Sequence, residues 1–537
     1  MLVLRDARIF DRPGRWALTI IEGRIAWIGP ESDAPHAGKQ IDLGGATLLP
    51  GFCDSHVHLF GGGAALGQLN LAAVHSAPDL ARAVADWATA HPGSQLISAY
   101  GANYDLIGSK GRPDRHALDA ALPDRPLYIA ATDFHCAWAN TEALRQAGIL
   151  HGSPVEGVMT GSDGLASGEL QEFAAMDLVK AIGPTGGREG LGLVGAEPAS
   201  VSPADRTRDI QTLRQAVQAC LALGITSVCN MDGNIYQAEL LTELARADAL
   251  DIDISLPMTL VPGMSTARRE ALYLQAAMPP IGRLRFGAVK MFMDGVFDTW
   301  TAFRTDDYPD RPGFRGTPLF SPAEYARNCI EADARGLQIA THAVGDGAVR
   351  AALDGYAAAA MANGRRDSRH RIEHIDMIHP DDLPRLRDLG VVASMQPVHP
   401  PGSSGLPLEP TISIMGKARW RDTFAWRAIL DSGSLIAFGT DWPVSPLSPF
   451  NALHSALSRR PWAKDGPDMR LDLAECLAAY SAAGAMVRFA DAYQGQIAVG
   501  MQADLIAVSG DLAKLANARD ACRVIMTISK GKIAFQS

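Results

Sequence analysis

Apolar, β-rich runs alternate with Ala-rich helical runs through most of the chain. This alternation favours parallel strands joined by helical crossovers. Eight is the strand number of a (β/α)8 TIM barrel, so the pattern predicts an α/β fold of that kind. The eight strand-like segments are the one ending at His58 and those beginning at Ile225, Ile252, Phe286, Leu337, His370, Gly390 and Leu435.

Both ends of the chain have a different pattern, of short strands separated by turns. Glu22-Gly23 and Lys530-Gly531 are hairpin-like pairs between apolar runs. Short sheets need partner strands to bury a face. We therefore expect residues 1–50 plus 490–537 to form a composite β-sandwich domain from both termini; two independent β appendages are the alternative.

A long segment separates the first expected barrel strand from the second. Residues 60–210 exceed any ordinary barrel loop, so an inserted α+β subdomain near the barrel mouth is expected. Residues 51–59 plus 211–489 are left for the barrel. Residues 397–419, rich in Pro, Gly and Ser, follow the seventh strand. They are expected to be either a lid over the mouth or a simple surface loop.

Composition narrows the class of protein. The 537 residues include 49 Lys and Arg against 59 Asp and Glu, a net charge of −10, so no nucleic-acid partner is expected. The N-terminus lacks signal-peptide features, and no apolar run reaches the roughly 18 residues of a membrane span. Seven scattered cysteines favour reduced thiols. These features predict a cytoplasmic protein without a membrane partner.

Two histidines lie at the end of the first expected barrel strand. Because strand side chains alternate faces, His56 and His58 are expected on the same side, close enough to hold one cation. The pair alone is a weak indication, since zinc sites need three or four donors.

Further polar residues end other expected strands, and the carboxyl ends of barrel strands open on one face. Taken singly, each of these residues has a purely structural explanation. A histidine can be a hydrogen-bonded core residue, a buried lysine can pair with a carboxylate, and an aspartate before proline can belong to a turn. Together they would be costly to bury without partners, by several kcal/mol each, and a shared cation removes that cost. The residues at these strand ends are His56, His58, Lys290, His342, His374 and Asp441.

The motifs around these residues resemble those of a known family. They are LLPGFCDSHVHL, VKMFMDG, IATHAVGDGAV, RHRIEHIDMI, SMQP and FGTDWPVSP. With them the sequence resembles the amidohydrolase superfamily and, within it, amidohydrolase family 3, which includes N-substituted formamide deformylases. The resemblance runs essentially from end to end. It implies a hydrolase acting on carbon–nitrogen bonds other than peptide bonds, with a small-molecule substrate.

The resemblance also implies a binuclear metal centre. His56 and His58 would bind the more buried metal together with Asp441. The metals are generally zinc, although imidazole and oxygen ligands also suit other divalent first-row metals. A metal-bridged hydroxide would attack the amide, because coordination lowers the pKa of water from about 15.7 to about 7. Asp441 would take the proton from the water and deliver it to the leaving amine.

His342 and His374 would bind the second metal by the same resemblance. Lys290, carboxylated on its amine, would bridge the two metals. An unmodified ammonium has no acceptor lone pair and would be repelled by both cations. Asp54 shares the face of the first two histidines and is expected to support them rather than bind metal.

Five further residues are weaker candidates for substrate contacts. Packing is the alternative for the tryptophans, and a structural pair is the alternative for Asp133 with His135. The candidates are Asp133, His135, Trp300, Arg419 and Trp420.

Some positions depart from the family pattern and leave the substrate open. The insertion has Gly101-Ala102-Asn103-Tyr104 in place of Gly-x-Gly-Trp, and Gly347 stands where the family often has Arg. Hydrolysis of a lactone, an ester or a cyclic amide on the same site is an alternative. A catalytically silent metal or ligand-binding barrel is another. Homo-oligomerisation is also left open.

Overall fold

The chain folds into two compact units. One is made of Met1–His58 with Val217–Ser537, and the other of Leu59–Ala216. The computed structural model describes residues 1–104, 106–107, 112–132 and 136–537.

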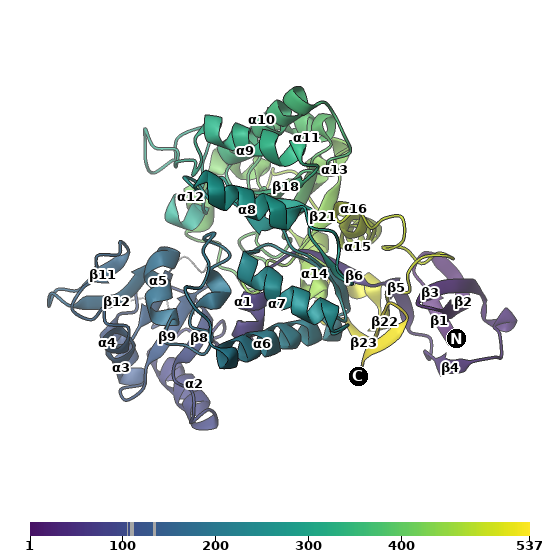
Figure 1. The fold of residues 1–537 in the computed structure, drawn as a ribbon, viewed down its shortest axis with the longest axis horizontal. Coiled ribbons are helices and arrows are strands. Elements are labelled where there is room, and N and C mark those ends of the chain that lie inside the picture. The colour runs from purple at the N-terminus through teal and green to yellow at the C-terminus, as the bar shows by residue number, and fades with distance from the viewer. Residues whose placement is uncertain (105, 108–111, 133–135) are drawn as a thin grey trace. The chain divides into compact units, whose positions relative to one another are not determined.

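Strands from both ends of the chain form one eight-stranded sheet in the first unit (Figure 1). They are β1 (Leu2–Ile9), β2 (Arg12–Ile21), β3 (Arg24–Pro30), β4 (Lys39–Asp42), β5 (Thr47–Pro50), β22 (Leu505–Gly510), β23 (Cys522–Ser529) and β24 (Lys532–Gln536). The order is β24-β23-β22-β5-β1-β2-β3, with β4 paired to β1. Antiparallel pairing of β22 with β5 joins the two ends of the chain.

Both predicted hairpin turns are confirmed. Glu22 and Gly23 connect β2 to β3 with φ of 50° and 76°, and Lys530 and Gly531 connect β23 to β24 with φ of 48° and 77°. Two consecutive residues with positive φ are typical of the type I′ turn, whose twist matches that of the flanking strands.

Parallel strands make up the rest of the sheet structure in this unit. One sheet has the order β16-β14-β13-β6 and the other β15-β17-β18-β19-β20-β21. Every pair is parallel, as the alternation of strands and helices predicted. The strands are β6 (Phe52–Val57), β13 (Ile225–Asn230), β14 (Asp253–Ser255), β15 (Met258–Thr259), β16 (Leu284–Arg285), β17 (Ala288–Phe292), β18 (Gln338–Ala343), β19 (Arg371–His374), β20 (Val392–Met395) and β21 (Ile436–Phe438).

The strand predicted from Ile252 is split in two. β14 ends at Ser255 and β15 begins at Met258, and the two lie in different sheets. Pro257 lies between them and has no backbone N–H for a strand ladder. Isolated parallel bridges join Gly233 to Met258 and Val57 to Trp442.

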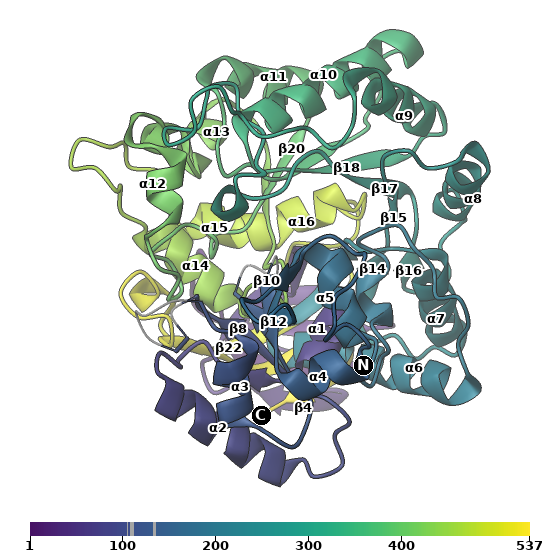
Figure 2. The same cartoon turned by 90° about the vertical axis from the view of Figure 1, so that its left-hand side faces the viewer.

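Helices follow most of these parallel strands. In both views α9, α10 and α11 lie side by side on one side of β18 (Figures 1 and 2), and Figure 2 shows β17 and β20 on the same side of these helices. The helices are α7 (Ile235–Arg246), α8 (Thr266–Ala276), α9 (Pro322–Ala334), α10 (Asp346–Asn363), α11 (Leu383–Leu389), α12 (Thr411–Met415), α13 (Trp426–Asp431), α14 (Pro449–Ser458), α15 (Leu473–Tyr480) and α16 (Ala482–Val487).

Local sequence explains where helices start. Ser321 caps α9 by accepting from the backbone N–H of Glu324, and Pro322 occupies the first turn. Asp472 and Glu475 form a reciprocal capping box at α15. Such caps satisfy backbone donors that the helix itself leaves free.

The second unit contains a six-stranded sheet of order β11-β12-β10-β9-β8-β7. Alternate residues face opposite sides: Ile129 packs into one apolar cluster, whereas its neighbours Tyr128 and Ala130 pack into another. The elements are β7 (Leu69–Asn70), β8 (Ile97–Ala102), β9 (Leu127–Ala131), β10 (Cys136–Ala139), β11 (Val158–Thr160), β12 (Ala166–Gln171), α1 (Leu59–Ala65), α2 (Ala77–Ala90), α3 (Arg115–Ala121), α4 (Thr141–Gln146) and α5 (Glu172–Lys180), followed by α6 (Pro203–Ala222) across the boundary.

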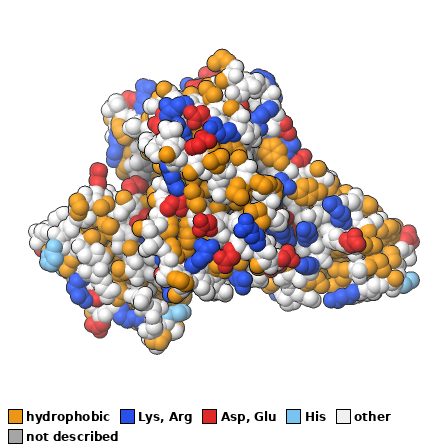
Figure 3. Space-filling model, viewed as in Figure 1, with side chains coloured by type: hydrophobic (Ala, Val, Ile, Leu, Met, Phe, Trp, Pro, Cys, Tyr) orange, Lys and Arg blue, Asp and Glu red, His pale blue; other side chains and the backbone are white. Residues whose placement is uncertain are grey.

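The surface and the cysteines agree with an ordinary globular composition. On the face that Figure 3 shows, basic and acidic side chains are interspersed. All seven cysteines are buried. Among the described residues, no helix combines the length and the apolarity needed to cross a bilayer.

Candidate metal centre

The end of β6 lies against the loop that follows β21. The backbone N–H of Asp441 donates to the carbonyl of His56 at 2.7 Å, and that of His58 donates to the carbonyl of Trp442 at 2.8 Å. A Cβ at Gly439 would lie 2.5 Å from the His56 backbone nitrogen, closer than real Cβ atoms approach. A glycine at this position therefore allows the two segments to meet.

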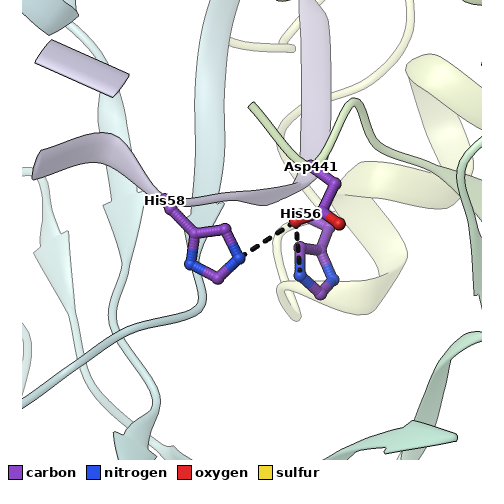
Figure 4. Close-up of side chains that lie close together, drawn as sticks. All are labelled: His56, His58 and Asp441. Carbon is purple, nitrogen blue, oxygen red and sulfur yellow. Dashed lines mark ion pairs between the residues drawn. The ribbon is translucent and has the colours of Figure 1, made fainter. Parts of the chain in front are cut away.

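Three of the predicted metal ligands converge here. His58 Nε2 lies 2.9 Å and His56 Nε2 lies 3.3 Å from Asp441 Oδ1. Figure 4 shows both imidazoles directed at this carboxylate. The donor atoms all lie within 4.8 Å of one another. Among the described residues, Asp441 Oδ1 is buried without a hydrogen-bond partner, which is the condition that a bound cation relieves.

A second group of donors lies on the other side of the same carboxylate. His399 Nε2 lies 3.7 Å and His374 Nδ1 lies 4.0 Å from Asp441 Oδ2. The ring centroids of His374 and His399 are 5.8 Å apart and the rings are nearly parallel, at 10°. His374 was predicted from the sequence, whereas His399 was missed.

Lys290 and His342 lie beside these groups. The Lys290 side chain is fully buried, and its Nζ has no hydrogen-bond partner. His342 Nε2 lies 3.1 Å from the Gly295 carbonyl oxygen, and its ring centroid is 4.4 Å from that of His374. Within the described chain, His342 belongs to neither group of closely spaced donor atoms.

Burial keeps His56, His342 and His374 neutral. It lowers the pKa of His56 to about 4 and that of His342 to about 3, and it lowers the pKa of His374 well below its ordinary value. Burial also lowers the pKa of Lys290 to about 8. For Asp441 burial acts upward, but His56 and His58 outweigh it and hold the pKa low. Neutral imidazoles and an ionised carboxylate are the forms that bind metal.

Glu373 orients His56. His56 Nδ1 lies 2.7 Å from Glu373 Oε2, and Arg371 Nε donates to Glu373 Oε1 at 2.5 Å. Burial raises the pKa of Glu373, but Arg371 and His56 outweigh it, so the carboxylate is ionised and accepts from Nδ1–H. The free lone pair of His56 is then on Nε2, facing Asp441. A carboxylate behind a ligating histidine is common in metal sites.

Asp54 holds the strand end against the loop. Its Oδ1 accepts from the backbone N–H of Thr440 at 3.0 Å and of His56 at 3.1 Å, and its Oδ2 accepts from the Thr440 hydroxyl at 2.6 Å. Burial raises its pKa to about 7. These contacts fix residues on both sides of the donor group, in keeping with the expected supporting role.

Comparison with known proteins identifies the family. The amidohydrolase family model matches residues 39–535. The chain belongs to the amidohydrolase family. The family predicted from the sequence motifs is therefore confirmed.

Individual relatives match over nearly the whole chain. Protein LONG AFTER FAR-RED 3 of Arabidopsis thaliana is 30% identical over 516 residues, which cover 92% of this chain and 84% of that protein. N-substituted formamide deformylase of Arthrobacter pascens is 25% identical over 552 residues, covering 95% and 93%. The crystal structure of an uncharacterised metal-dependent hydrolase from Pyrococcus horikoshii OT3 superposes with a TM-score of 0.75 at 23% identity, covering 97% and 99%. That likeness supports the mixed α/β fold.

Asp294 organises the next loops of this amidohydrolase. Its Oδ2 accepts from the backbone N–H groups of Phe303 at 2.8 Å and Gly345 at 2.9 Å, and its Oδ1 accepts from that of Val344 at 3.0 Å. Its Oδ1 lies 3.7 Å from His342 Nε2. One buried carboxylate therefore joins the loops after β17 and β18.

The substrate-binding candidates have structural partners where the structure describes them. Arg419 donates to three carboxylates, at 2.8 to 2.9 Å, and Trp420 Nε1 donates to the Ile412 carbonyl at 2.7 Å. Trp300 Nε1 lies 3.0 Å from an oxygen of Asp310. Their contact with substrate stays a prediction. Asp133 and His135 lie outside the described residues.

Proposed function

We propose that this amidohydrolase is a metal-dependent hydrolase that cleaves the carbon–nitrogen bond of a non-peptide amide. The observation that carries the proposal is the buried donor group of His56, His58 and Asp441, in which Asp441 Oδ1 has no hydrogen-bond partner among the described residues. Amide hydrolysis is further supported by the relative whose name states that it deformylates N-substituted formamides.

We also propose that the parallel strands close into a (β/α)8 barrel. The isolated bridges between Val57 and Trp442 and between Gly233 and Met258 lie where the two parallel sheets meet. Cys229 of one sheet packs in the same buried cluster as residues of three strands of the other sheet. Strands of both sheets thus share one interior, as barrel strands do.

The donor chemistry suits zinc. Two imidazole nitrogens and one carboxylate leave an open position, as in catalytic zinc sites, although other divalent first-row metals also accept these ligands. His342, His374 and carboxylated Lys290 would hold a second ion. When bound, the ions lower the pKa of a coordinated water and polarise the substrate carbonyl.

The side chains supply the proton transfers and the orientation. Asp441 is ionised and buried, so its carboxylate accepts a proton from the attacking water and delivers it to the leaving amine. Glu373 fixes the ring of His56. Asp54 holds the backbone of His56 and Thr440, and so holds Asp441 in place.

Hydrolysis assays on metal-loaded protein test the proposal. A panel of N-substituted amides, cyclic amides, esters and lactones, with and without prior chelation, separates amide cleavage from the alternatives. We expect Asp441→Asn to lose about 10²–10⁴-fold in kcat on the amide substrate, the usual contribution of general acid–base catalysis. The exposed Asp468→Asn is the matched control. Full turnover by metal-replete Asp441→Asn would contradict the assigned role, and metal binding without hydrolysis of any panel member would contradict the function.

A further inference from the structure

The two oxygens of Asp441 face two different pairs of histidines. Oδ1 lies 2.9 Å from His58 Nε2 and 3.3 Å from His56 Nε2. Oδ2 lies 3.7 Å from His399 Nε2 and 4.0 Å from His374 Nδ1. One carboxylate is therefore placed between two sets of nitrogen donors.

No hydrogen bond of His399 Nε2 to a described residue explains the position of this side chain. His399 follows β20 by four residues, and its Nε2 is buried without a hydrogen-bond partner. An unpartnered buried polar atom costs about 1–3 kcal/mol. A cation between His399, His374 and Asp441 would remove that cost.

The spacing of these atoms fits coordination after a small contraction. Donors bound to one tetrahedral zinc ion at about 2.0–2.2 Å lie about 3.3–3.6 Å apart. The separations of 3.7 Å and 4.0 Å around Asp441 Oδ2 need to shrink by only a few tenths of an ångström or so.

We propose that His399 is a metal ligand. Together with His374 and Asp441 Oδ2 it holds a second divalent cation, and Asp441 bridges this cation to the one at His56 and His58. The inference rests on the metal dependence in the proposed function and adds to it a ligand that neither the motifs nor the relatives' names supply.

His342 is less well placed for this position. Its Nε2 lies 3.1 Å from the Gly295 carbonyl oxygen, so one ring nitrogen has a backbone partner. It is absent from the close donor group that contains His374 and His399 in the part of the chain described. The loop after β20 thus contributes a ligand at this position beside His374 of β19.

The number of metal ions bound per chain tests the proposal directly. Apoprotein of the full chain is loaded with Co²⁺, dialysed, and analysed for cobalt per chain, and the binding constants are measured by titration. We expect two equivalents in the wild type and in the control His454→Gln, whose ring bonds to the Leu515 carbonyl. In His399→Gln we expect one equivalent, with the second bound at least 10-fold more weakly, since even the partner of a ligand is worth about 10–100-fold.

A second measurement does not depend on the variant's folding. Crystals of the cobalt-loaded wild type should show an anomalous peak between His374, His399 and Asp441. No peak there, a single equivalent in the wild type, or two unweakened equivalents in folded His399→Gln would each overturn the proposal. Activity is measured separately. If the protein binds two cobalt ions but hydrolyses no panel member, only the proposed function is refuted. If the enzyme is active and His399→Gln binds metal like the wild type, only this inference is refuted.

Discussion

Replacing Glu373 by Gln tests how the first donor group is oriented. Gln keeps the shape of the side chain but removes its charge and turns one acceptor oxygen into a donor NH2. Glu373 now accepts from His56 Nδ1 at 2.7 Å and from Arg371 at 2.5 and 2.9 Å. A glutamine has one acceptor oxygen, so its NH2 faces either the Arg371 Nε–H or His56 Nδ1. In the second orientation His56 changes tautomer and places its proton toward Asp441, and in both orientations the buried Arg371 loses its charged partner.

The two consequences have different magnitudes. Removing one partner of a buried ion pair costs about 3–5 kcal/mol of stability, because the remaining charge is left uncompensated. The side chains of Arg371 and Glu373 are at most 1% exposed, so the range for a buried ion pair applies. Arg371 keeps its bonds to the Ser55 carbonyl and the Ser394 hydroxyl, which favours the lower half of that range. Loss of the carboxylate behind His56 weakens metal binding by about 10–100-fold, or about 1.4–2.7 kcal/mol.

The assay measures metal affinity and unfolding on the same preparations. Titration of apoprotein with Zn²⁺ against a competing chelator gives the affinity, and urea unfolding of the apoprotein gives the stability. Glu331→Gln is the matched control, because Glu331 pairs with Arg269 at 3.1 Å near the surface. Such pairs contribute about 0–1 kcal/mol, and the control should bind metal like the wild type. If folded Glu373→Gln binds Zn²⁺ as tightly as the wild type, the orienting role of Glu373 is refuted.

Two further predictions concern packing and pH. Gly439→Ala should disrupt the contact with the His56 backbone, because the new Cβ would lie 2.5 Å from its nitrogen; we expect a destabilised protein with weaker zinc binding, checked by thermal unfolding and titration. Asp333→Asn should destabilise by about 1–3 kcal/mol at pH 7, because bonds from His370, Asn363 and Arg366 outweigh burial and hold the Asp333 pKa below its ordinary value. The depressed pKa stabilises the fold above the unfolded pKa of about 3.9. The difference in the free energy of unfolding between the variant and the wild type should therefore persist from neutral pH to about pH 4 and shrink as the pH falls further. Unfolding curves at several pH values would contradict this if the difference grew in acid.

The grouping of His56, His58 and Asp441 was predictable because it follows from local rules. Strand side chains alternate, and parallel strands in one sheet present their carboxyl ends at one edge. Those rules place His56 and His58 together, and they bring Asp441 to the same edge from the other end of the chain. The hairpins at Glu22-Gly23 and Lys530-Gly531 were predictable for the same reason, since a two-residue turn is decided by its own two residues.

Residues that act through a distant partner were not predictable in this way. Glu373 lies 317 positions from His56 in the chain, and inside the strand RIEH it has the pattern of any alternating polar residue. Its role depends on which side chain faces it across the interior. His399 lies beyond the end of β20 in a segment rich in proline, where neither strand nor helix periodicity fixes the direction of a side chain. The division of one predicted strand into β14 and β15 needed attention to Pro257, which a hydrophobic pattern does not weigh.

The charge balance of the site links the histidines to Lys290. Arg371 compensates Glu373, whereas Asp441 interacts with the buried Lys290 ammonium and acts to raise the Lys290 pKa against the effect of burial. That ammonium has no hydrogen-bond partner and a pKa of only about 8. Carboxylation would convert it into a second anion and leave Asp441 without compensation in a buried site. Such a state is stable only with divalent cations between the two groups. We therefore expect carboxylation of Lys290 to favour metal loading, and metal loading to favour carboxylation.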